Sequence, residues 1–318
     1  MSDILIITVN YKGADSTERF LKSASELDGW DMAHFIVVEN GSHDGSAAKL
    51  RALVRDFPNV ELMESAENQG YFGAANWALQ QYQAQAQKPD WVIVCNNDIA
   101  FDDHQFLRKL SQRDLAGAQV IAPAIIARPG NIDCNPFMRK RPSRFKLLRC
   151  QFWQSNYYLM WFKQWLSPYV RTARHRIYFW RRPSLSAGPS DVYAPHGAFL
   201  IFSRAYFEAG GYIDDGFFLY AEEFSVAEIC RQLQLRVVHD PGLRVWHDAH
   251  HVTGRMCNRT TFEYGRQGFR YALRKYFLAT KHGTTKYGTT KYGTTRHGTS
   301  STLPEARAAA PADNSARD

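Results

Sequence analysis

Ile4-Leu-Ile-Ile-Thr-Val9 runs directly into Asn10-Tyr-Lys-Gly13. A short, β-branched apolar run that stops at polar residues and a glycine predicts a strand buried on both faces. A helix is expected over 15–27, where apolar residues recur at helical spacing after Ser16, its expected cap. A second buried strand is expected over 35–38. Strand, helix and strand in this order predict a right-handed βαβ crossover.

The same pattern of strand and helix then repeats along the chain. It predicts an α/β fold with a Rossmann-like mixed sheet, mostly parallel, flanked by helices. Ligands of such sheets bind beyond the carboxyl ends of the strands, where the polar loop over 39–46 and the glycine-containing loop over 67–73 are expected. The further expected strands cover 60–63, 91–95, 198–203 and 236–239, and the further helices cover 47–56, 74–87 and 221–233.

The composition indicates a globular protein with one large domain. The chain has 318 residues, 45% of them hydrophobic and 14% aromatic, which is enough for a substantial core. A formal charge of +8 fits nucleic acid, an anionic membrane or a phosphorylated substrate without choosing among them. Five separated cysteines without a CxxC pair fit a reducing cytoplasm better than a disulfide framework or a zinc ribbon. We expect neither a signal peptide nor a membrane span.

Two segments carry candidate metal ligands. Val94-Cys-Asn-Asn-Asp98 ends an expected strand in polar residues, and Asp98 is its best candidate ligand for a divalent cation. The alternative is an Asn/Asp turn that caps the next helix. His247 follows a strand-like run and could supply an imidazole nitrogen. Because His250 and His251 lie nearby, a cluster of surface histidines is the alternative for this residue.

Adjacent carboxylates follow an aromatic run in Gly211-Tyr-Ile-Asp-Asp-Gly-Phe-Phe-Leu-Tyr-Ala-Glu-Glu-Phe224. Glu223 is the candidate general base, and Glu222 would orient the loop or the acceptor. The alternative for Glu223 is an exposed carboxylate in the first turn of a helix. Glu39 could accept a hydrogen bond from a pyrimidine N3–H or a ribose hydroxyl, or could be an ordinary loop carboxylate. Base, metal and phosphate sites at one sheet edge indicate nucleotide-sugar chemistry.

The segment over 134–190 is cationic and aromatic. No acidic residue occurs between Cys134 and Ser190, while arginine, tryptophan and tyrosine are frequent. This composition suits the headgroup layer of an anionic membrane, and a packed subdomain with a basic outer face is the alternative. The repeat that begins at Lys281-His-Gly-Thr-Thr has no aliphatic residues to bury, so 281–318 is expected to be a disordered, low-complexity tail.

Taken in order, these motifs resemble those of the family 2 glycosyltransferases of GT-A fold, and most closely their bacterial rhamnosyltransferase-like branch. The resemblance covers about residues 3–250. Its motifs are Thr8-Val-Asn-Tyr11, Val37-Val-Glu-Asn-Gly-Ser-His-Asp-Gly-Ser46, Glu67-Asn-Gln-Gly-Tyr-Phe-Gly-Ala-Ala-Asn76, Cys95-Asn-Asn-Asp98, His196-Gly-Ala-Phe-Leu-Ile-Phe202, Gly210-Gly-Tyr-Ile-Asp-Asp-Gly-Phe-Phe-Leu-Tyr-Ala-Glu-Glu223 and Pro241-Gly-Leu-Arg-Val-Trp-His247.

The resemblance implies a metal-dependent glycosyltransferase that inverts the anomeric carbon in a single displacement. Asp98 and His247 would ligate Mg²⁺ or Mn²⁺, and Glu223 would be the base. The donor would be a dTDP- or UDP-sugar, with dTDP-rhamnose favoured, and the acceptor a glycan or lipid-linked glycan of a surface polysaccharide. The nucleotide-binding residues would be Val9, Tyr11, Glu39, Asn68, Gly70, Asn76, Asn96 and Asn97, and the acceptor side would hold His196, Gly197 and Asp215.

The expected organisation is a single GT-A domain over 1–280 followed by the tail. Its nucleotide-binding half covers 1–100, the basic aromatic segment 134–190, and the acceptor and base half 191–280. We expect a cytoplasmic protein, and the membrane interpretation of the basic segment would hold it peripherally at the inner face of the cell membrane.

Departures from the family pattern keep a second function open. Glu39 and Glu223 stand where the family usually has aspartate, and Ser225 stands where it has an acidic residue. Its usual arginine falls on Ile229, and Arg231 comes two places later. A catalytically degenerate protein that binds a nucleotide-sugar or a glycan is therefore the alternative. Nucleic-acid binding ranks last, because only charge and aromatic content support it.

Overall fold

The computed structural model describes residues 3–85, 88–128, 132–166, 188–248 and 258–278. The chain divides into a compact unit, Met1–Ala279, and a second unit, Thr280–Asp318, of which no residue is described. The expected tail over 281–318 therefore lies outside the described residues. The same is true of 167–187 in the basic aromatic segment, and of His250 and His251.

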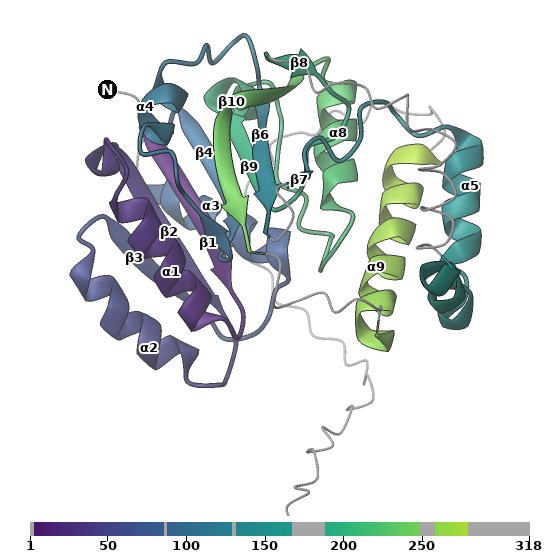
Figure 1. The fold of residues 1–318 in the computed structure, drawn as a ribbon, viewed down its shortest axis with the longest axis horizontal. Helices are drawn as coiled ribbons and strands as arrows, with labels where there is room; N and C mark the ends of the chain where they lie inside the picture. Colours follow the sequence, from purple (N-terminus) through teal and green to yellow (C-terminus); the bar gives the residue numbers. More distant parts are fainter. Residues whose placement is uncertain (1–2, 86–87, 129–131, 167–187, 249–257, 279–318) are drawn as a thin grey trace, which may run out of the picture. The chain divides into compact units, whose positions relative to one another are not determined.

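One mixed sheet forms the centre of the compact unit (Figure 1). Its strands are β1 (Ile4–Asn10), β2 (Ala33–Asn40), β3 (Val60–Ser65), β4 (Trp91–Asn96), β5 (Ile99–Ala100), β6 (Val120–Ala127), β7 (Ile132–Asp133), β8 (Ser190–Asp191), β9 (Phe199–Ser203) and β10 (Val237–His247). They lie in the order β3-β2-β1-β4-β9-β6-β10-β5, with β7 beside β6 and β8 beside β10. The first four strands of this order are parallel, as the βαβ pattern predicts. β9 runs antiparallel to both β4 and β6, and β6 and β10 are parallel.

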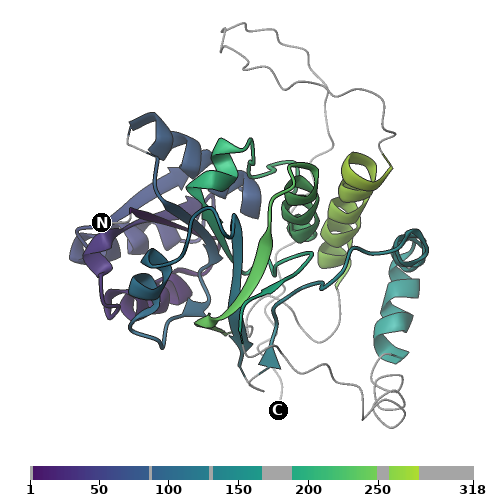
Figure 2. The same ribbon diagram turned by 90° about the horizontal axis from the view of Figure 1, so that it is seen from above.

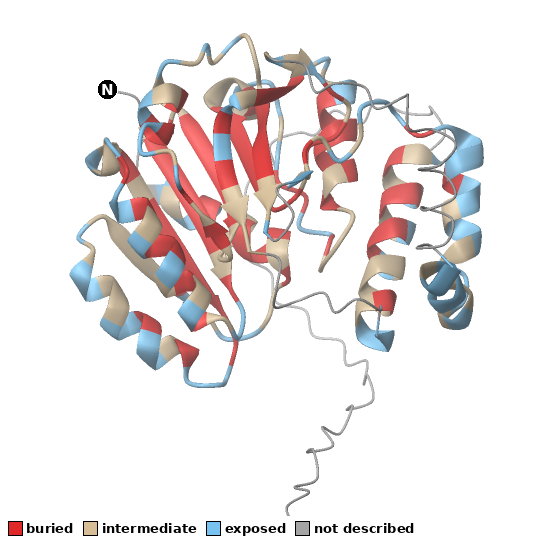
Figure 3. Ribbon diagram, viewed as in Figure 1, coloured by how far each residue is buried: buried red, intermediate tan, exposed pale blue. Residues whose placement is uncertain are grey.

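Helices cover both faces of this sheet. They are α1 (Ala14–Ser25), α2 (Ser46–Leu53), α3 (Tyr71–Gln85), α4 (Phe106–Ser111), α5 (Arg144–Trp153), α7 (Arg204–Glu208), α8 (Glu222–Gln232) and α9 (Arg259–Ala272), with short 3₁₀ turns at Trp30–Met32 and Val54–Asp56 and a π-helical turn at Leu273–Phe277. Neighbouring residues of a strand face opposite sides of the sheet. Leu5 and Ile7 therefore pack with α3, α8 and α9, while Ile4 and Ile6 pack with α1 and α4. Figure 3 shows the central strands buried between the two layers.

Three local predictions are wrong. α3 begins at Tyr71, so Gly73 lies inside the helix and the expected loop over 67–73 is shorter. The expected strand over 236–239 and the strand-like run before His247 are one strand, β10, because a shift in its pairing with β6 accommodates the proline and glycine between Asp240 and Arg244. Ser16 does not cap α1, whose N-cap position is Gly13.

No helix was predicted in the basic aromatic segment, and none was predicted beyond residue 233. The described part of that segment contains α5 and a run of helical residues, 157–166, and α9 lies beyond the site and packs against α8. Figures 1 and 2 show α5 at the edge of the compact unit, outside α8 and α9. In the part of the chain that the structure describes, no helix has the length and apolar character needed to cross a bilayer.

Candidate active site

The carboxyl ends of β1, β2 and β4 meet at one edge of the sheet. In the register of these strands Asn10 lies beside Glu39, and Val9 lies beside Asn96. Tyr11, the next residue after β1, is 47% exposed. The structure thus brings together the polar strand ends that were predicted to form the nucleotide site.

Glu39 is buried, and backbone groups hold its carboxylate. The N–H of Gly41 donates to Oε2 at 3.2 Å, and the N–H of Ser42 donates to Oε1 at 2.9 Å. The Ser42 hydroxyl accepts a hydrogen bond from the N–H of Lys12 at 3.0 Å, which joins the loops after β1 and β2. Each carboxylate oxygen keeps acceptor capacity for a ligand. Contact between Glu39 and a base or ribose stays a prediction.

Asn97 braces the loop after β1. Its Nδ2 donates to the carbonyl of Gly13 at 3.1 Å and to Oγ1 of Thr17 at 3.0 Å. A nucleotide contact through this nitrogen would have to replace one of these bonds. Asn97 therefore braces the nucleotide site through Nδ2, and its contact with the nucleotide stays a prediction.

The loop before α3 joins the nucleotide-binding half to the base-bearing half. Oδ1 of Asn68 accepts hydrogen bonds from Nδ2 of Asn40 at 3.0 Å and from the N–H of Gly70 at 2.8 Å. Gly70 has φ +75°, and a Cβ on it would lie 2.2 Å from the carbonyl oxygen of Phe218. The N–H of Tyr71 donates to that same oxygen at 2.9 Å. Only glycine allows this approach of two backbones.

Asp98 and His247 come from distant parts of the chain and meet at this edge. Because β5 pairs antiparallel with β10, His247 lies opposite Ile99, the residue after Asp98. Nε2 of His247 lies 3.2 Å from Oδ1 of Asp98, and both side chains are mostly buried. Asp98 leads into a strand and does not cap a helix, and His247 is not a surface histidine. The helix-cap alternative for Asp98 is therefore wrong, whereas the cluster that was the alternative for His247 includes His250 and His251, which lie outside the described residues.

The pair formed by Asp98 and His247 fits two positions of an octahedral cation. Oδ1 of Asp98 is buried, and its contact with Nε2 of His247 lacks the geometry of a hydrogen bond. Neighbouring ligand atoms at ~2.1 Å from an octahedral ion lie about 3 Å apart, close to the separation observed here. Carboxylate oxygen and neutral imidazole nitrogen are common ligands of divalent cations. Within the ranges given above, no group of three or more His, Cys, Asp or Glu could hold an ion, so further ligands would have to come from the donor or from water.

His196 lies next to His247, with ring centroids 6.2 Å apart. Its Nδ1 accepts a hydrogen bond from the N–H of Ala198 at 3.1 Å. Burial, with a contribution from His247, lowers the pKa of His196 to about 4. The ring is therefore neutral at neutral pH, with its proton on Nε2. On the expected acceptor side it can donate a hydrogen bond to a hydroxyl.

Glu223 lies in the first turn of α8 and is half-buried. The alternative interpretation, an exposed carboxylate in a first turn, is therefore wrong. The N–H of Gly197 donates to its Oε1 at 3.3 Å. A Cβ on Gly197 would lie 3.1 Å from that oxygen, so the glycine leaves room for the carboxylate. Burial raises the pKa of Glu223. A carboxylate whose pKa lies closer to neutral pH is a stronger base.

Tyr71 connects the two halves of the site, and the sequence analysis did not single it out. Its hydroxyl donates to the carbonyl of Gly197 at 3.0 Å. Burial raises the pKa of Tyr71, and nearby acidic groups add to the rise, namely Cys95, Glu222, Asp98 and Glu223. The phenol thus lies within electrostatic reach of the strand-end carboxylate and of the carboxylates on α8. Its place directly after Gly70 was the only signal in the sequence.

Glu222 is buried beside Glu223, and its Oε1 has no hydrogen-bond partner in the described part of the chain. Burial, together with the charge of Glu223, raises the pKa of Glu222 to about 8. Glu222 therefore carries a proton at neutral pH, which leaves the negative charge on Glu223. This difference favours the expected division of roles, with Glu223 as base and Glu222 as its support.

Glu222 should make stability depend on pH. Because its pKa in the folded protein lies above the value in an unfolded chain, the folded state binds this proton more tightly. The free energy of unfolding should then fall as pH rises from about 4.5 to about 8. We expect the melting temperature of Glu222→Gln to fall less across this window than that of the wild type. The exposed Glu208→Gln is the control, and equal pH profiles for wild type and Glu222→Gln would contradict the assignment.

The two residues before these carboxylates have left-handed backbone conformations. Tyr220 has φ +70° and Ala221 has φ +72°, and such conformations persist only where the surroundings hold them. α9 provides this support, because Gly268 packs directly on the backbone of Tyr220. A Cβ on Gly268 would lie 2.3 Å from the carbonyl oxygen of Tyr220. α9 therefore helps to set the direction of Glu222 and Glu223.

Two glycines of α9 allow this support to be tested. Gly268→Ala should lower both the melting temperature and turnover, because overpacking of a close contact costs about 1–3 kcal/mol. Gly265→Ala is the matched control: its Cβ would meet nothing closer than the Tyr220 ring at 3.9 Å, and alanine is favoured in a helix interior. Thermal unfolding and initial rates measure the two effects. Equal behaviour of both variants would show that α9 does not hold this segment.

Asp214 ties the loop before α8 to the end of α9. Its buried carboxylate accepts hydrogen bonds from the hydroxyl of Tyr271 at 2.9 Å, from Nζ of Lys275 at 3.0 Å and from the hydroxyl of Tyr276 at 2.5 Å. The neighbouring Asp215 accepts a hydrogen bond from Nδ2 of Asn76 at 3.1 Å. A cavity of about 300 Å³ adjoins this contact and is lined by Gln69, Gly73, Asn76, Trp77, Gln80 and Asp215.

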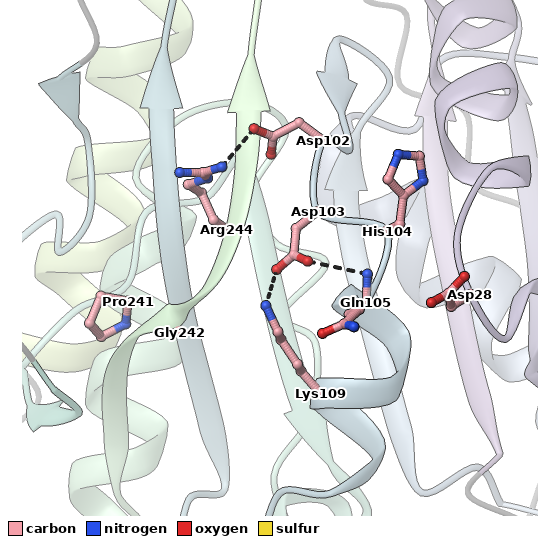
Figure 4. Close-up of a pocket in the computed structure, with 9 residues that line it drawn as sticks. All are labelled: Asp28, Asp102, Asp103, His104, Gln105, Lys109, Pro241, Gly242 and Arg244. Atoms are coloured by element: carbon pink, nitrogen blue, oxygen red, sulfur yellow. Dashed lines mark hydrogen bonds and ion pairs between the residues drawn. The ribbon is translucent and has the colours of Figure 1, made fainter.

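A larger cavity, of about 670 Å³, lies away from this site between the loop before α4 and the middle of β10 (Figure 4). It contains none of the expected site residues. Arg244 pairs with Asp102 at 2.9 Å, and Lys109 pairs with Asp103 at 2.6 Å. Because its charges largely neutralise each other in pairs, this cavity is a poor place for a nucleoside diphosphate.

Comparisons with known proteins agree with this geometry. The model of the family "Glycosyl transferase family 2" matches residues 3–178, more than half of the chain. The N-acetylglucosaminyl-diphospho-decaprenol L-rhamnosyltransferase of Mycobacterium tuberculosis is 28% identical over 269 residues, which are 80% of this chain and 79% of that protein. The low-salt glycan biosynthesis hexosyltransferase Agl10 of Haloferax volcanii is 22% identical over 237 residues, 74% of this chain and 64% of that protein.

Solved structures extend the likeness to the fold. GalNAc-T7 with UDP, GalNAc and Mn²⁺ superposes with a TM-score of 0.55 at 13% identity, over 86% of this chain and 48% of that one. S. aureus TarS 1-349 in complex with UDP-GlcNAc superposes with a TM-score of 0.52 at 12% identity, over 87% of this chain and 68% of that one. The expected GT-A fold class is confirmed.

Proposed function

The chain belongs to glycosyl transferase family 2, and we propose that this glycosyltransferase is metal-dependent and inverts the anomeric carbon of a nucleotide-sugar. The observation that carries the proposal is the meeting of two sets of residues at His196 and Gly197, which are neighbours in the chain. On one side lies the pair of Asp98 and His247, and on the other lies Glu223, held by the N–H of Gly197. These are the parts needed to neutralise a leaving diphosphate and to deprotonate an attacking hydroxyl.

In the proposed reaction Glu223 accepts the proton of the acceptor. The acceptor oxygen forms a bond to the anomeric carbon, its proton passes to the carboxylate, and the nucleoside diphosphate leaves with the electrons of the broken bond. One carboxylate suffices for this single displacement, which inverts the carbon. Glu222, protonated and buried, supports the base. A divalent cation bound by Asp98 and His247 would supply positive charge for the leaving diphosphate.

The donor and acceptor are proposed from the named relatives. One is an L-rhamnosyltransferase named for a diphospho-decaprenol-linked acceptor, and the other is a hexosyltransferase named for glycan biosynthesis. We propose a dTDP- or UDP-sugar as donor, with dTDP-rhamnose first, and a glycan or lipid-linked glycan of a surface polysaccharide as acceptor. The buried carboxylate of Glu39 would accept the N3–H of the pyrimidine. Such an acceptor would be met at the cytoplasmic face of the cell membrane.

A panel of UDP-, dTDP- and GDP-sugars, each with Mg²⁺ or Mn²⁺, tests the proposal. Nucleotide release and protection against thermal unfolding are both measured, with glycan and lipid-linked acceptors present. We expect metal-dependent release with one pyrimidine donor. Protection without turnover would instead favour the degenerate binding protein. The presence of Ser225 where the family has an acidic residue supports that alternative. Absence of both responses would contradict the proposed donor class.

A further inference from the structure

Two helical segments outside the site expose stripes of large apolar side chains. On α5, Phe145, Leu148 and Phe152 share one face and are 72%, 63% and 57% exposed. The helical residues 157–166 repeat this pattern, because five exposed apolar residues fall on one face at helical spacing. They are Tyr158, Trp161, Phe162, Trp165 and Leu166. Figure 3 shows the outer side of α5 as exposed. We refer to the two faces together as the apolar face.

The concentration of these residues makes the apolar face unusual. Of the thirteen large hydrophobic side chains exposed in the described residues, eight belong to it. Single exposed apolar residues need no explanation, but stripes of large apolar side chains along two helices mark a surface that contacts something else.

The charge around the apolar face indicates an anionic partner. Residues 134–166 contain seven Lys or Arg and no Asp or Glu, so this short segment carries +7 of the formal charge of +8 of the chain. Arg141 is already engaged, because its Nε donates to the buried Glu228 at 2.7 Å and its guanidinium lies over the Phe277 ring. The other cations are exposed, namely Arg139, Lys140, Arg144, Lys146, Arg149 and Lys163.

We propose that α5 and residues 157–166 dock on an anionic lipid bilayer. Short amphipathic helices with Trp, Tyr and Phe on one face and Lys and Arg beside it lie in the interfacial layer of membranes, where rings meet acyl chains and cations meet phosphate. A second copy of this chain would bring the same positive charge against itself, which disfavours self-association. The use of the apolar face for presenting a lipid-linked acceptor rests on the proposed function.

The apolar face is joined to the part of the site that carries the base. Nη2 of Arg259, the first residue of α9, donates to the hydroxyl of Tyr158 at 3.0 Å. The rings of Tyr157 and Phe262 meet edge to face with centroids 5.6 Å apart. Further along α9, Gly268 packs on Tyr220, two residues before Glu222. A bilayer bound at the apolar face would therefore have a defined direction relative to the base.

Flotation of the full chain with phosphatidylcholine vesicles, with and without phosphatidylglycerol, tests this surface. The wild type should bind only the anionic vesicles. Reversing three charges in Arg144→Glu/Lys146→Glu/Arg149→Glu should weaken binding by about 100-fold or more. Arg19→Glu/Arg55→Glu/Lys88→Glu, with the same charge change on exposed cations elsewhere, is the matched control and should bind much better.

The apolar contribution is tested by Phe145→Ser/Leu148→Ser/Phe152→Ser. It should lose vesicle binding but keep its melting temperature, whereas Ile132→Ser, an equally exposed position on β7, should keep both. Equal flotation of the wild type, of Arg144→Glu/Lys146→Glu/Arg149→Glu and of Phe145→Ser/Leu148→Ser/Phe152→Ser would overturn the proposal. The proposal would also be overturned if the wild type failed to bind vesicles and instead formed a concentration-dependent dimer that the serine variant abolishes.

The two proposals fail in different ways. Vesicle binding without turnover of any nucleotide-sugar would leave the docking surface standing and contradict the proposed reaction. Turnover of a nucleotide-sugar with a water-soluble acceptor, without binding to anionic vesicles, would contradict the docking surface alone.

Discussion

Glu223→Gln should lower kcat by roughly 10²- to 10⁴-fold, the usual contribution of a positioned acid or base. Glutamine keeps the size of the side chain, but it cannot accept the proton of the acceptor hydroxyl. The hydrogen bond from the N–H of Gly197 to Oε1 can be kept by the amide oxygen, so the local structure should be preserved. Donor affinity should barely change. The measurement is kcat with the identified donor and acceptor, alongside donor affinity.

Two further variants show whether the roles of the adjacent carboxylates are assigned correctly. Glu223→Asp introduces the usual residue of the family, whose side chain is shorter. The variant should retain activity if the pocket still lets an aspartate reach the acceptor hydroxyl. Glu222→Gln mimics the protonated acid and should retain most turnover. If Glu222→Gln alone abolishes turnover, the two roles are exchanged, and if Glu223→Gln turns over like the wild type, the base lies elsewhere.

The second large effect is expected at the metal. Asp98→Ala should abolish metal-dependent binding of the nucleotide-sugar, because the carboxylate paired with His247 would be lost and the diphosphate would face a weakened cation site. Titration with Mn²⁺ and Mg²⁺, read by donor affinity and turnover, measures the effect. His247→Ala should weaken metal affinity less severely while the fold stays intact.

A matched control separates this effect from a general loss of negative charge. Asp102→Ala removes a carboxylate from the larger cavity, where it pairs with Arg244. It should leave the metal response unchanged. Wild-type metal affinity in Asp98→Ala would mean that Asp98 is only a turn residue. A lost metal response in Asp102→Ala would move the donor site to the larger cavity.

The strands that position the nucleotide site could be predicted from the sequence. Ile4, Ile6, Leu5 and Ile7 are all fully buried, because a strand covered on both faces has no polar positions, and such a run is easily recognised. The meeting of Asp98 and His247 was expected because both are candidate metal ligands that follow strand-like runs. Its physical cause is the antiparallel pairing of β5 with β10, which the local sequence does not reveal.

The contacts that complete the site could not be predicted because they join segments far apart in the chain. Gly70 and Phe218 meet across the site, and so do Gly268 and Tyr220. A glycine in a loop or a helix does not indicate which distant backbone approaches it. Tyr71 gave no chemical signal, since its importance comes from the groups that surround it. The start of α3 at Tyr71 was missed because Gly70 and Gly73 together resemble a loop.

The basic aromatic segment shows why composition can indicate a kind of surface without giving its geometry. Arg141 and Arg149 each add one positive charge to the composition. In the structure Arg141 is paired with Glu228, which is fully buried, whereas Arg149 has an exposed position on α5. Only the fold distinguishes a cation that stabilises the core from one that is free to meet an anionic partner.

The position of β9 limits how the specificity of this enzyme could be redesigned. β9 belongs to the second half of the sequence, yet it pairs along its length with β4 of the first half, from Trp91 opposite Ser203 to Cys95 opposite Phe199. A chimera that joined the first half of this chain to the second half of a relative would create a foreign strand interface in the centre of the sheet. A chimera designed to change the acceptor preference should therefore exchange only the loop over 211–221. Its β4 and β9 should both come from the same protein.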